Sequence, residues 1–207
     1  IVCFTMMFVG GAKIKHLGSI IGAAFMGFLF LMLINMAFPG FLPRVDTWEK
    51  RMMSYGSGNK QENYQAEMAK RAVANGFLFG KGPGKGHVKN DLYSAQSDFI
   101  YASSIEEFGS IIGGIGLLIL YMILFFRAIR IMNKVESKFA AHLVFGLSFM
   151  LIFQSFINMG VGVNLLPVTG QPLPLISMGG TSILFTCFSL GIILNVSSTV
   201  YNDSVDA

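Results

Sequence analysis

The sequence predicts an all-α protein, a polytopic helical membrane protein, and two observations carry this prediction. Of the 207 residues, 53% are hydrophobic and only 13% are charged, about half of the ~25% charged fraction of an ordinary soluble domain. The charges are also unevenly spread, because 17 of the 26 lie between Arg44 and Glu107 while several stretches of about twenty residues carry none. A helix of about 20 apolar residues crosses a bilayer. This layout excludes a soluble globular domain.

Four uncharged runs are long enough to be complete spans, and a shorter run precedes them. Because the first residue is Ile1 rather than Met and follows no signal-peptide pattern, we expect a fragment with four complete transmembrane helices and part of a fifth. The predicted segments are a partial span at 1–9, complete spans at 17–38, 108–126, 139–163 and 176–200, and a tail at 201–207.

The basic residues predict the orientation of these spans. Lys13 and Lys15 lie in the first short loop, and four Lys or Arg residues lie in 127–138. Positive short loops face the cytoplasm, so residues 39–107 and 164–178 are predicted to be extracytoplasmic and the C-terminal tail cytoplasmic. The function is therefore expected on the outer face.

The net charge of +4 follows from the same topology, since the basic residues form no continuous face. Nucleic acid is therefore not an expected partner. Cys3 and Cys187 lie in apolar runs, where thiols are inert and form no disulfide framework.

The outer insert is predicted to contain short amphipathic helices that rest on the membrane surface. Residues 46–55 place Trp48 and Met52 on one face, as in an interfacial helix. A second helix is predicted over Gln61–Asn75, ended by Gly76. The following Gly80–Gly86 segment has four glycines and one proline, which exclude helix and strand.

Two interpretations of this cationic loop remain open. Its backbone N–H groups and lysines could hold a phosphate, although no nucleotide-binding motif is present. Alternatively, Lys81, Lys85 and Lys89 could simply stay solvated near lipid headgroups.

Asp98 lies just before the next apolar run and therefore at the outer membrane boundary. One interpretation is that it caps the helix, since Asp is a favoured N-cap. However, Ser103-x-x-Glu106 and Ser104-x-x-Glu107 have capping-box form and would start the helix later. Asp98 would then be free to act as a base in a partly desolvated site.

The uncharged loop from Asn164 to Ser182 contains three prolines and a Gly-Gly pair. Backbone this irregular at membrane depth must be buried in protein or line a cavity. In the preceding span, Gln154 and Asn158 are predicted to make interhelical hydrogen bonds. His87 and His142 lack ligand-spaced partners, so no metal site is expected. Spans free of charged residues also argue against an ion-coupled carrier.

Five motifs in this order resemble the SEDS family of bacterial cell-wall synthesis proteins. They are Tyr64-Gln65, the glycine-rich run Gly76–Gly84, Ser97-Asp-Phe-Ile-Tyr-Ala102, Glu106-Glu-Phe-Gly109 and Leu166–Ser182. The resemblance covers nearly the whole chain and is strongest to the division branch of the family. Since members have about ten spans, it implies that this chain is the C-terminal half.

The resemblance implies a peptidoglycan glycosyltransferase that polymerises lipid II on the outer face of the inner membrane, at the division septum, with a class B penicillin-binding protein and divisome components as partners. Asp98 matches the essential aspartate of the family. No cofactor is evident, and dependence on a divalent cation is left open. The candidates for binding the substrate are Lys81, Lys85, Arg44, Arg51, Arg71, Lys89 and Gln65, and those for lining the cavity are Pro167, Gly170, Pro174, Ser177, Gly179 and Gly180.

Two departures and two alternatives accompany this hypothesis. Some members carry an acidic residue where this chain has Asn90, and some carry a lysine where it has Thr169, so a mechanism that needs those charges is doubtful here. The alternatives are a lipid II flippase, suggested by the many spans, and a non-catalytic membrane scaffold for the penicillin-binding protein, suggested by the large insert.

Overall fold

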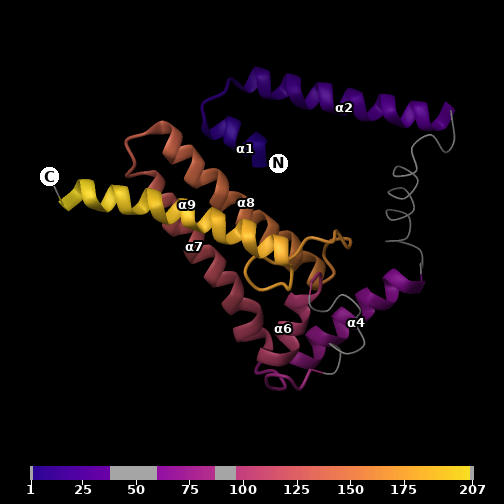
Figure 1. Cartoon of the computed structure of the whole chain (residues 1–207). Helices are drawn as coiled ribbons and strands as arrows, with labels where there is room; N and C mark the ends of the chain where they lie inside the picture. Colours follow the sequence, from indigo (N-terminus) through magenta and orange to yellow (C-terminus); the bar gives the residue numbers. More distant parts are fainter. Residues whose placement is uncertain (1, 38–59, 87–96, 206–207) are drawn as a thin grey trace. The chain divides into compact units, whose positions relative to one another are not determined.

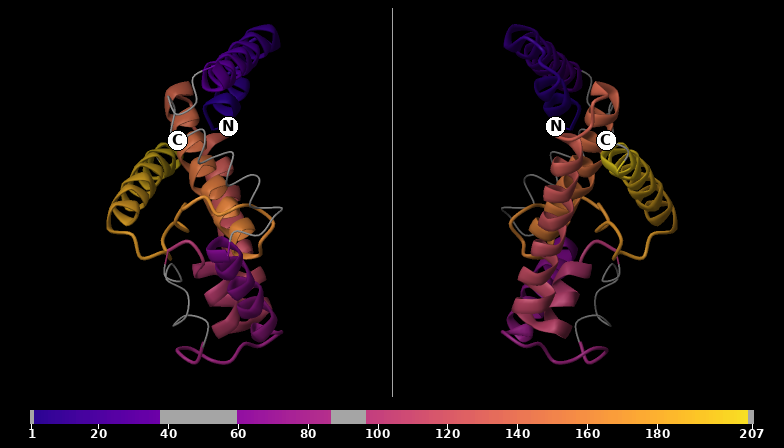
Figure 2. Two further views of the ribbon diagram at one scale, coloured as in Figure 1. Left: turned by 90° about the vertical axis from the view of Figure 1, so that its right-hand side faces the viewer. Right: turned by 90° about the vertical axis from the view of Figure 1, so that its left-hand side faces the viewer.

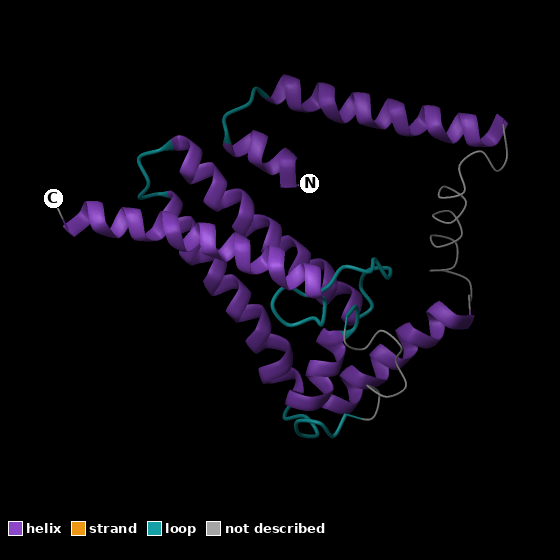
Figure 3. Cartoon of the chain, viewed as in Figure 1, coloured by secondary structure: helices purple, strands orange, loops and turns teal. Residues whose placement is uncertain are grey.

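The structure is a computed structural model that describes residues 2–37, 60–86 and 97–205 of the chain. Every regular element in these ranges is a helix, which confirms the all-α prediction (Figure 3). The chain forms two compact units, Ile1–Lys60 and Gln61–Ala207, and each is described by itself (Figure 1). The helix predicted at 46–55 lies outside the described residues.

The first unit is a helical hairpin of α1 (Val2–Val9) and α2 (Ile14–Ala37). The chain turns at Gly11, whose φ of 79° suits glycine. The apolar side chains of α2 are largely exposed, with Phe25 at 60% and Leu33 at 65%. At about 1.5 Å per residue, its 24 residues suffice to cross a bilayer, as the uncharged run 17–38 predicts.

All of α4 (Lys60–Gly76) except its first residue belongs to the second unit, and this is the helix predicted over 61–75. Ala69 and Ala72 lie three residues apart on one face and are fully buried, because small side chains let α4 approach its neighbours closely. Its partners are α6 (Ile100–Gly109) and α8 (Lys138–Gly162). The buried cluster that joins the three helices consists of Ala69, Ala72, Phe99, Ala102 and Val161.

Three long helices form the rest of this unit: α7 (Leu117–Met132), α8 and α9 (Gly180–Val205). α7 packs along α8, and α9 contacts both (Figures 1 and 2). Phe125 of α7 meets Phe145 and Phe149 of α8 with ring centroids about 6 Å apart. Both faces of this contact are apolar and aromatic, as expected for packing within a membrane bundle.

The predicted span 108–126 is part of a longer helical run, Ile100–Met132. The run is broken at Gly109, which has a φ of 84° and is followed by a π-helix, η1 (Ser110–Gly116). A Cβ at Gly109 would lie 2.3 Å from the Leu78 carbonyl oxygen, so only glycine allows the loop after α4 to reach the break. Residues 100–107, predicted to be loop, are therefore helical.

Other boundaries also differ from the predictions. α7 continues to Met132, and α9 begins at Gly180 rather than at 176 and continues to Val205, into the predicted tail. In total, four helical segments of the described chain are long and apolar enough to cross a membrane, namely Ile14–Leu33, Ile100–Met132, Lys138–Gly162 and Gly180–Val200.

Candidate active site

Asp98 lies in the turn Ser97–Phe99 that leads into α6. The residue at the cap position of α6 is Phe99, and no side chain caps this helix, so the capping interpretation of Asp98 finds no support. The two capping boxes are also wrong, because Ser103 and Glu106 lie inside α6 and the Ser104 hydroxyl donates to the Ile100 carbonyl within the helix. The structure thus leaves Asp98 at the edge of the bundle, half-buried.

The backbone of this turn is held by two side chains from distant segments. The Asn158 amide of α8 donates to the carbonyl oxygens of Asp98 at 3.1 Å and Gln171 at 2.7 Å. The Ser177 hydroxyl donates to the Ser97 carbonyl at 2.8 Å and accepts the Leu173 N–H at 2.6 Å. Two consecutive carbonyls, those of Ser97 and Asp98, are therefore fixed from two sides.

The proline-rich loop between α8 and α9 is hydrogen-bonded to side chains of α7 and α8. Gln154 of α8 donates to the Pro172 carbonyl at 3.0 Å, and the Tyr121 hydroxyl of α7 donates to the Pro174 carbonyl. Leu173 is fully buried between these bonds. The predicted interhelical role of Gln154 and Asn158 is therefore wrong, since both satisfy backbone carbonyls of loop and turn that would otherwise be unpaired.

Burial raises the pKa of the Asp98 carboxyl, while a hydrogen bond from the Ser97 side chain acts in the opposite direction. Desolvation dominates because it destabilises the charged form more than one hydrogen bond stabilises it. A carboxylate in such surroundings is a stronger base than one in water. The turn therefore presents a general-base candidate.

Lys81 lies beside a carboxylate of the chain itself. Its ammonium is 3.2 Å from Glu106 Oε1, and the Asn75 amide donates to the same oxygen at 3.4 Å. The Glu106 side chain is fully buried. The backbone N–H groups of Lys81 and Gly82 donate to the Glu106 and Glu107 carbonyls at 3.0 and 2.9 Å. We call this arrangement the Lys81–Glu106 clamp, and it offsets much of the lysine charge within the protein.

The other predicted cations are distributed differently. Lys85 is exposed in the glycine-rich loop. Arg71 pairs with Glu67 at 3.0 Å on the exposed face of α4. Gln65 of the same helix is half-buried. Arg44, Arg51 and Lys89 lie outside the described residues.

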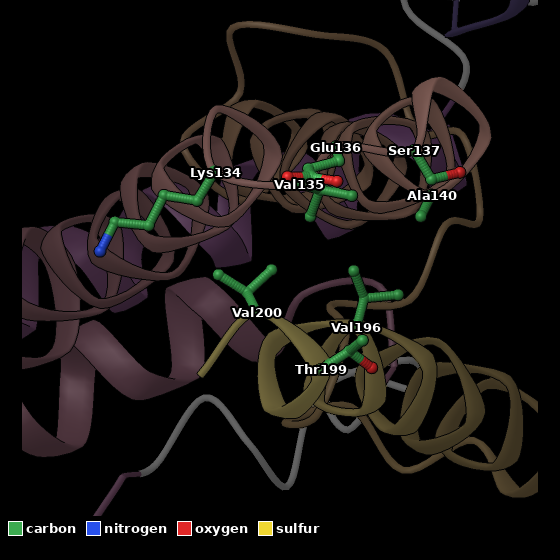
Figure 4. Close-up of a pocket in the computed structure, with 8 residues that line it drawn as sticks. All are labelled: Lys134, Val135, Glu136, Ser137, Ala140, Val196, Thr199 and Val200. Carbon is green, nitrogen blue, oxygen red and sulfur yellow. The ribbon is translucent and has the colours of Figure 1, made fainter. Parts of the chain in front are cut away.

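The predicted cavity-lining residues fall into two groups. Pro174 and Ser177 are buried in the hydrogen-bonded loop, whereas Gly179 is half-buried and Pro167, Gly170 and Gly180 are exposed. A pocket of about 560 Å³ lies elsewhere, at the opposite end of α7 and α8, between the α7–α8 turn and α9 (Figure 4). Lys134, Glu136 and Thr199 line it, so it is distinct from the Asp98 turn.

The described residues contain no cluster of metal-ligating side chains. Over 2–37, 60–86 and 97–205, no three His, Cys, Asp or Glu side chains gather as a metal site would require. Asp98 stands as a single carboxylate supported by neutral groups.

The sequence predicted no role for three further residues in holding the backbone of the Asp98 turn and the adjoining proline-rich loop. Asn158 and Gln154 were visible as a polar pair four residues apart in an apolar helix, but their partners are 13 to 61 positions away in sequence. Tyr121 was visible only as a hydroxyl within an apolar run.

The fold and site define a helical, multi-pass membrane protein with a fixed carboxylate turn at one end of its bundle. The chain belongs to the FtsW/RodA/SpoVE family, since the model of that family, described as a cell cycle protein, matches residues 1–202. This confirms the resemblance seen in the motifs.

Individual relatives agree with this assignment. A Francisella salina protein named probable peptidoglycan glycosyltransferase FtsW is 38% identical over 199 residues, which cover 92% of this chain and 46% of that protein. Stage V sporulation protein E of Bacillus subtilis is 36% identical over 205 residues, 94% of this chain and 51% of that protein. The chain spans about half the length of the curated relatives it matches.

A solved structure has a similar fold. It is described as "Structural coordination of polymerization and crosslinking by a peptidoglycan synthase complex", and one of its chains superposes with a TM-score of 0.66 and 26% identity. The match covers 97% of this chain and 54% of that one. The helical fold of this chain is thus similar to that of one chain in that structure.

Proposed function

We propose that this protein supplies the catalytic carboxylate of a peptidoglycan glycosyltransferase that polymerises lipid II, with Asp98 as general base. The observation that carries the proposal is the Asp98 turn itself: a half-buried carboxylate whose backbone is fixed by Asn158 and Ser177. The family names of the relatives support the same reaction class.

The chemistry follows from the substrate. The acceptor sugar hydroxyl has a pKa far above neutrality, so its oxygen becomes nucleophilic as Asp98 accepts its proton. That oxygen bonds to the anomeric carbon of the donor sugar, while the bond from this carbon to the diphosphate breaks and undecaprenyl diphosphate leaves. A positioned base of this kind contributes about a hundred- to ten-thousandfold in rate.

The leaving diphosphate gains negative charge and needs cations. Because Lys81 pairs with Glu106, the exposed Lys85 is the better candidate among the described residues. Arg44, Arg51 and Lys89 are further candidates from the same insert.

The test is the substitution Asp98→Asn in the intact protein, with a class B penicillin-binding protein present as the proposed partner and glycan strands formed from labelled lipid II as the readout. Glu67→Gln is the matched control, because it makes the same chemical change at an exposed carboxylate on α4. We expect a loss of at least about a hundredfold for Asp98→Asn and parental activity for Glu67→Gln. Undiminished polymerisation by Asp98→Asn would falsify the base role.

We further propose that the Asp98 end faces outward from the bacterial inner membrane, at the septum. The basic residues of 127–138 support this orientation. Single cysteines at Thr169 and Glu136, in a chain with Cys3 and Cys187 replaced by Ala, would test it with a membrane-impermeant thiol reagent on whole cells. Labelling at 169 and protection at 136 are expected, and the reverse pattern would invert the topology.

A further inference from the structure

The amide of Asn158 lies in an unusual position for an apolar helix. It is 1% exposed, and three carbonyl oxygens surround one of its terminal atoms: Gln171 at 2.7 Å, Asp98 at 3.1 Å and Ser97 at 3.5 Å. Three acceptors around one atom require that atom to be the NH₂ group, which fixes the orientation of the amide.

The oxygen of the same amide differs from its NH₂ group. Asn158 Oδ1 is buried and has no hydrogen-bond partner among the residues that the structure describes. A buried, unsatisfied acceptor is unfavourable, and a leucine would fill the same volume without this cost. The amide is therefore useful through its donors, and these contact the turn that carries Asp98.

Ser177 completes the arrangement from the loop. The residue is 2% exposed, and its hydroxyl bridges the Leu173 N–H to the Ser97 carbonyl. Ser97 and Asp98 are adjacent, so α8 and the 171–177 segment hold two successive peptide groups. The backbone dihedrals of a residue determine where its Cβ points, and Asp98 is thus aimed by groups about 60 and 80 positions away in the sequence.

We propose that Asn158, together with Ser177, is a positioning residue for glycosyl transfer, acting through the Asp98 turn rather than on the substrate. This inference rests on the proposed function of Asp98. A base must lie within hydrogen-bond reach of the proton that it takes, and a displacement of 1 Å can cost about a hundredfold in rate.

The test compares Asn158→Leu with Gln154→Met in the intact protein and its partner, with lipid II as substrate. Both residues donate to the 171–172 segment, but only Asn158 also contacts the Asp98 carbonyl. We expect Asn158→Leu to lower kcat about ten- to a hundredfold with KM changed less than about twofold, and Gln154→Met to lower kcat by much less.

A second background separates positioning from general structure. In an Asp98→Glu protein the carboxylate is already displaced, so adding Asn158→Leu should cost distinctly less than it does beside Asp98. Equal losses in the two backgrounds, or a rise in KM alone, would overturn the inference.

The serine gives an independent test if Asn158→Leu does not accumulate in the membrane. Ser177→Ala removes the hydroxyl and Ser177→Thr keeps it, so we expect kcat to fall for Ala and to recover for Thr. Parental kcat for Ser177→Ala would count against the inference. If Asp98→Asn itself stays active, the base role fails; if Asp98→Asn is inactive while Asn158→Leu and Ser177→Ala keep parental kcat, only the positioning role fails.

Discussion

Removing the ammonium of the Lys81–Glu106 clamp is expected to destabilise the protein strongly. Lys81→Met keeps a long side chain but deletes the charge that lies 3.2 Å from Glu106 Oε1. The carboxylate stays fully buried on α6, where the loss of one opposite charge is costly. The Lys81→Met substitution therefore weakens the contact between the glycine-rich loop and α6.

The magnitude follows from the separation and the burial. Two unit charges 3.2 Å apart attract by about 5 kcal/mol at an effective dielectric constant of about 20. Desolvation of the pair offsets part of this, and Lys81 is one-third exposed, so its charge is partly screened. Breaking a buried pair costs about 3–5 kcal/mol, and we expect the lower end, about 3 kcal/mol. Glu106→Gln together with Lys81→Met should recover most of that loss, with a coupling free energy of about 2 kcal/mol.

The assay is equilibrium unfolding of the intact protein in detergent micelles, followed by circular dichroism, for the parent, both single variants and the double variant. A loss below about 0.5 kcal/mol for Lys81→Met, or zero coupling, would refute this reasoning. Steady-state kinetics on the same proteins tests the role that the sequence predicts for Lys81. A higher KM with parental stability would assign the lysine to the substrate and not to Glu106.

Four further outcomes are expected. Gly109→Ala should lower the free energy of unfolding by at least about 2 kcal/mol, because the φ of Gly109 is 84° and the added Cβ would lie 2.3 Å from a backbone atom. The control is Gly170→Ala, which should cost only about 1 kcal/mol, since Gly170 has a φ of 69° but open space around it. Burial raises the pKa of Asp98 above 3.8, so kcat/KM should fall as pH falls through that raised pKa, because a protonated carboxyl cannot accept the proton. A pH profile without an acid limb would contradict this. The same shift means that the contribution of Asp98 to stability is complete below about pH 3.8 and is lost as pH rises through the raised pKa, so Asp98→Asn should unfold at pH 7 no earlier than the parent. Tyr121→Phe leaves the Pro174 carbonyl without its donor and should lower the free energy of unfolding by about 1–2 kcal/mol, and an unchanged thermal midpoint would exclude that role.

The helices were predictable because the physics that forms them is local. An uncharged run of twenty residues predicts a membrane-spanning helix. The helix α4 is predicted by an amphipathic pattern that ends at Gly76. The break at Gly109 was not predictable in this way, since Gly109 lies at the start of the uncharged run 108–126, which the sequence predicts as one span. Its cause lies about 30 positions earlier in the sequence, because the backbone carbonyls of Phe77 and Leu78 accept hydrogen bonds from the N–H groups of Ser110 and Ile111. No side chain of Phe77 or Leu78 takes part in these bonds.

The residues of the site also divide into those that the sequence could predict and those that it could not. Asp98 could be singled out because a carboxylate before an apolar run is unusual in itself. Its supports could not, because Asn158 and Ser177 act on carbonyl oxygens, and any residue type supplies a carbonyl. The Glu106–Lys81 pairing was hidden for another reason: the serines before Glu106 and Glu107 mimic a helix start, while the helix begins at Ile100.

The two ends of α6 are held by different kinds of interaction. Because of this difference, the chemical role of the Asp98 carboxylate can be tested separately from the structure of the turn. At Gly109 the helix is fixed by backbone contacts and the Lys81–Glu106 clamp; before Ile100 it is fixed by donors to the carbonyls of Ser97 and Asp98. Neither set uses the Asp98 carboxylate. An Asp98→Asn protein should therefore keep the turn, the helix and the loop in place, so that its loss of activity reports on the proton acceptor alone.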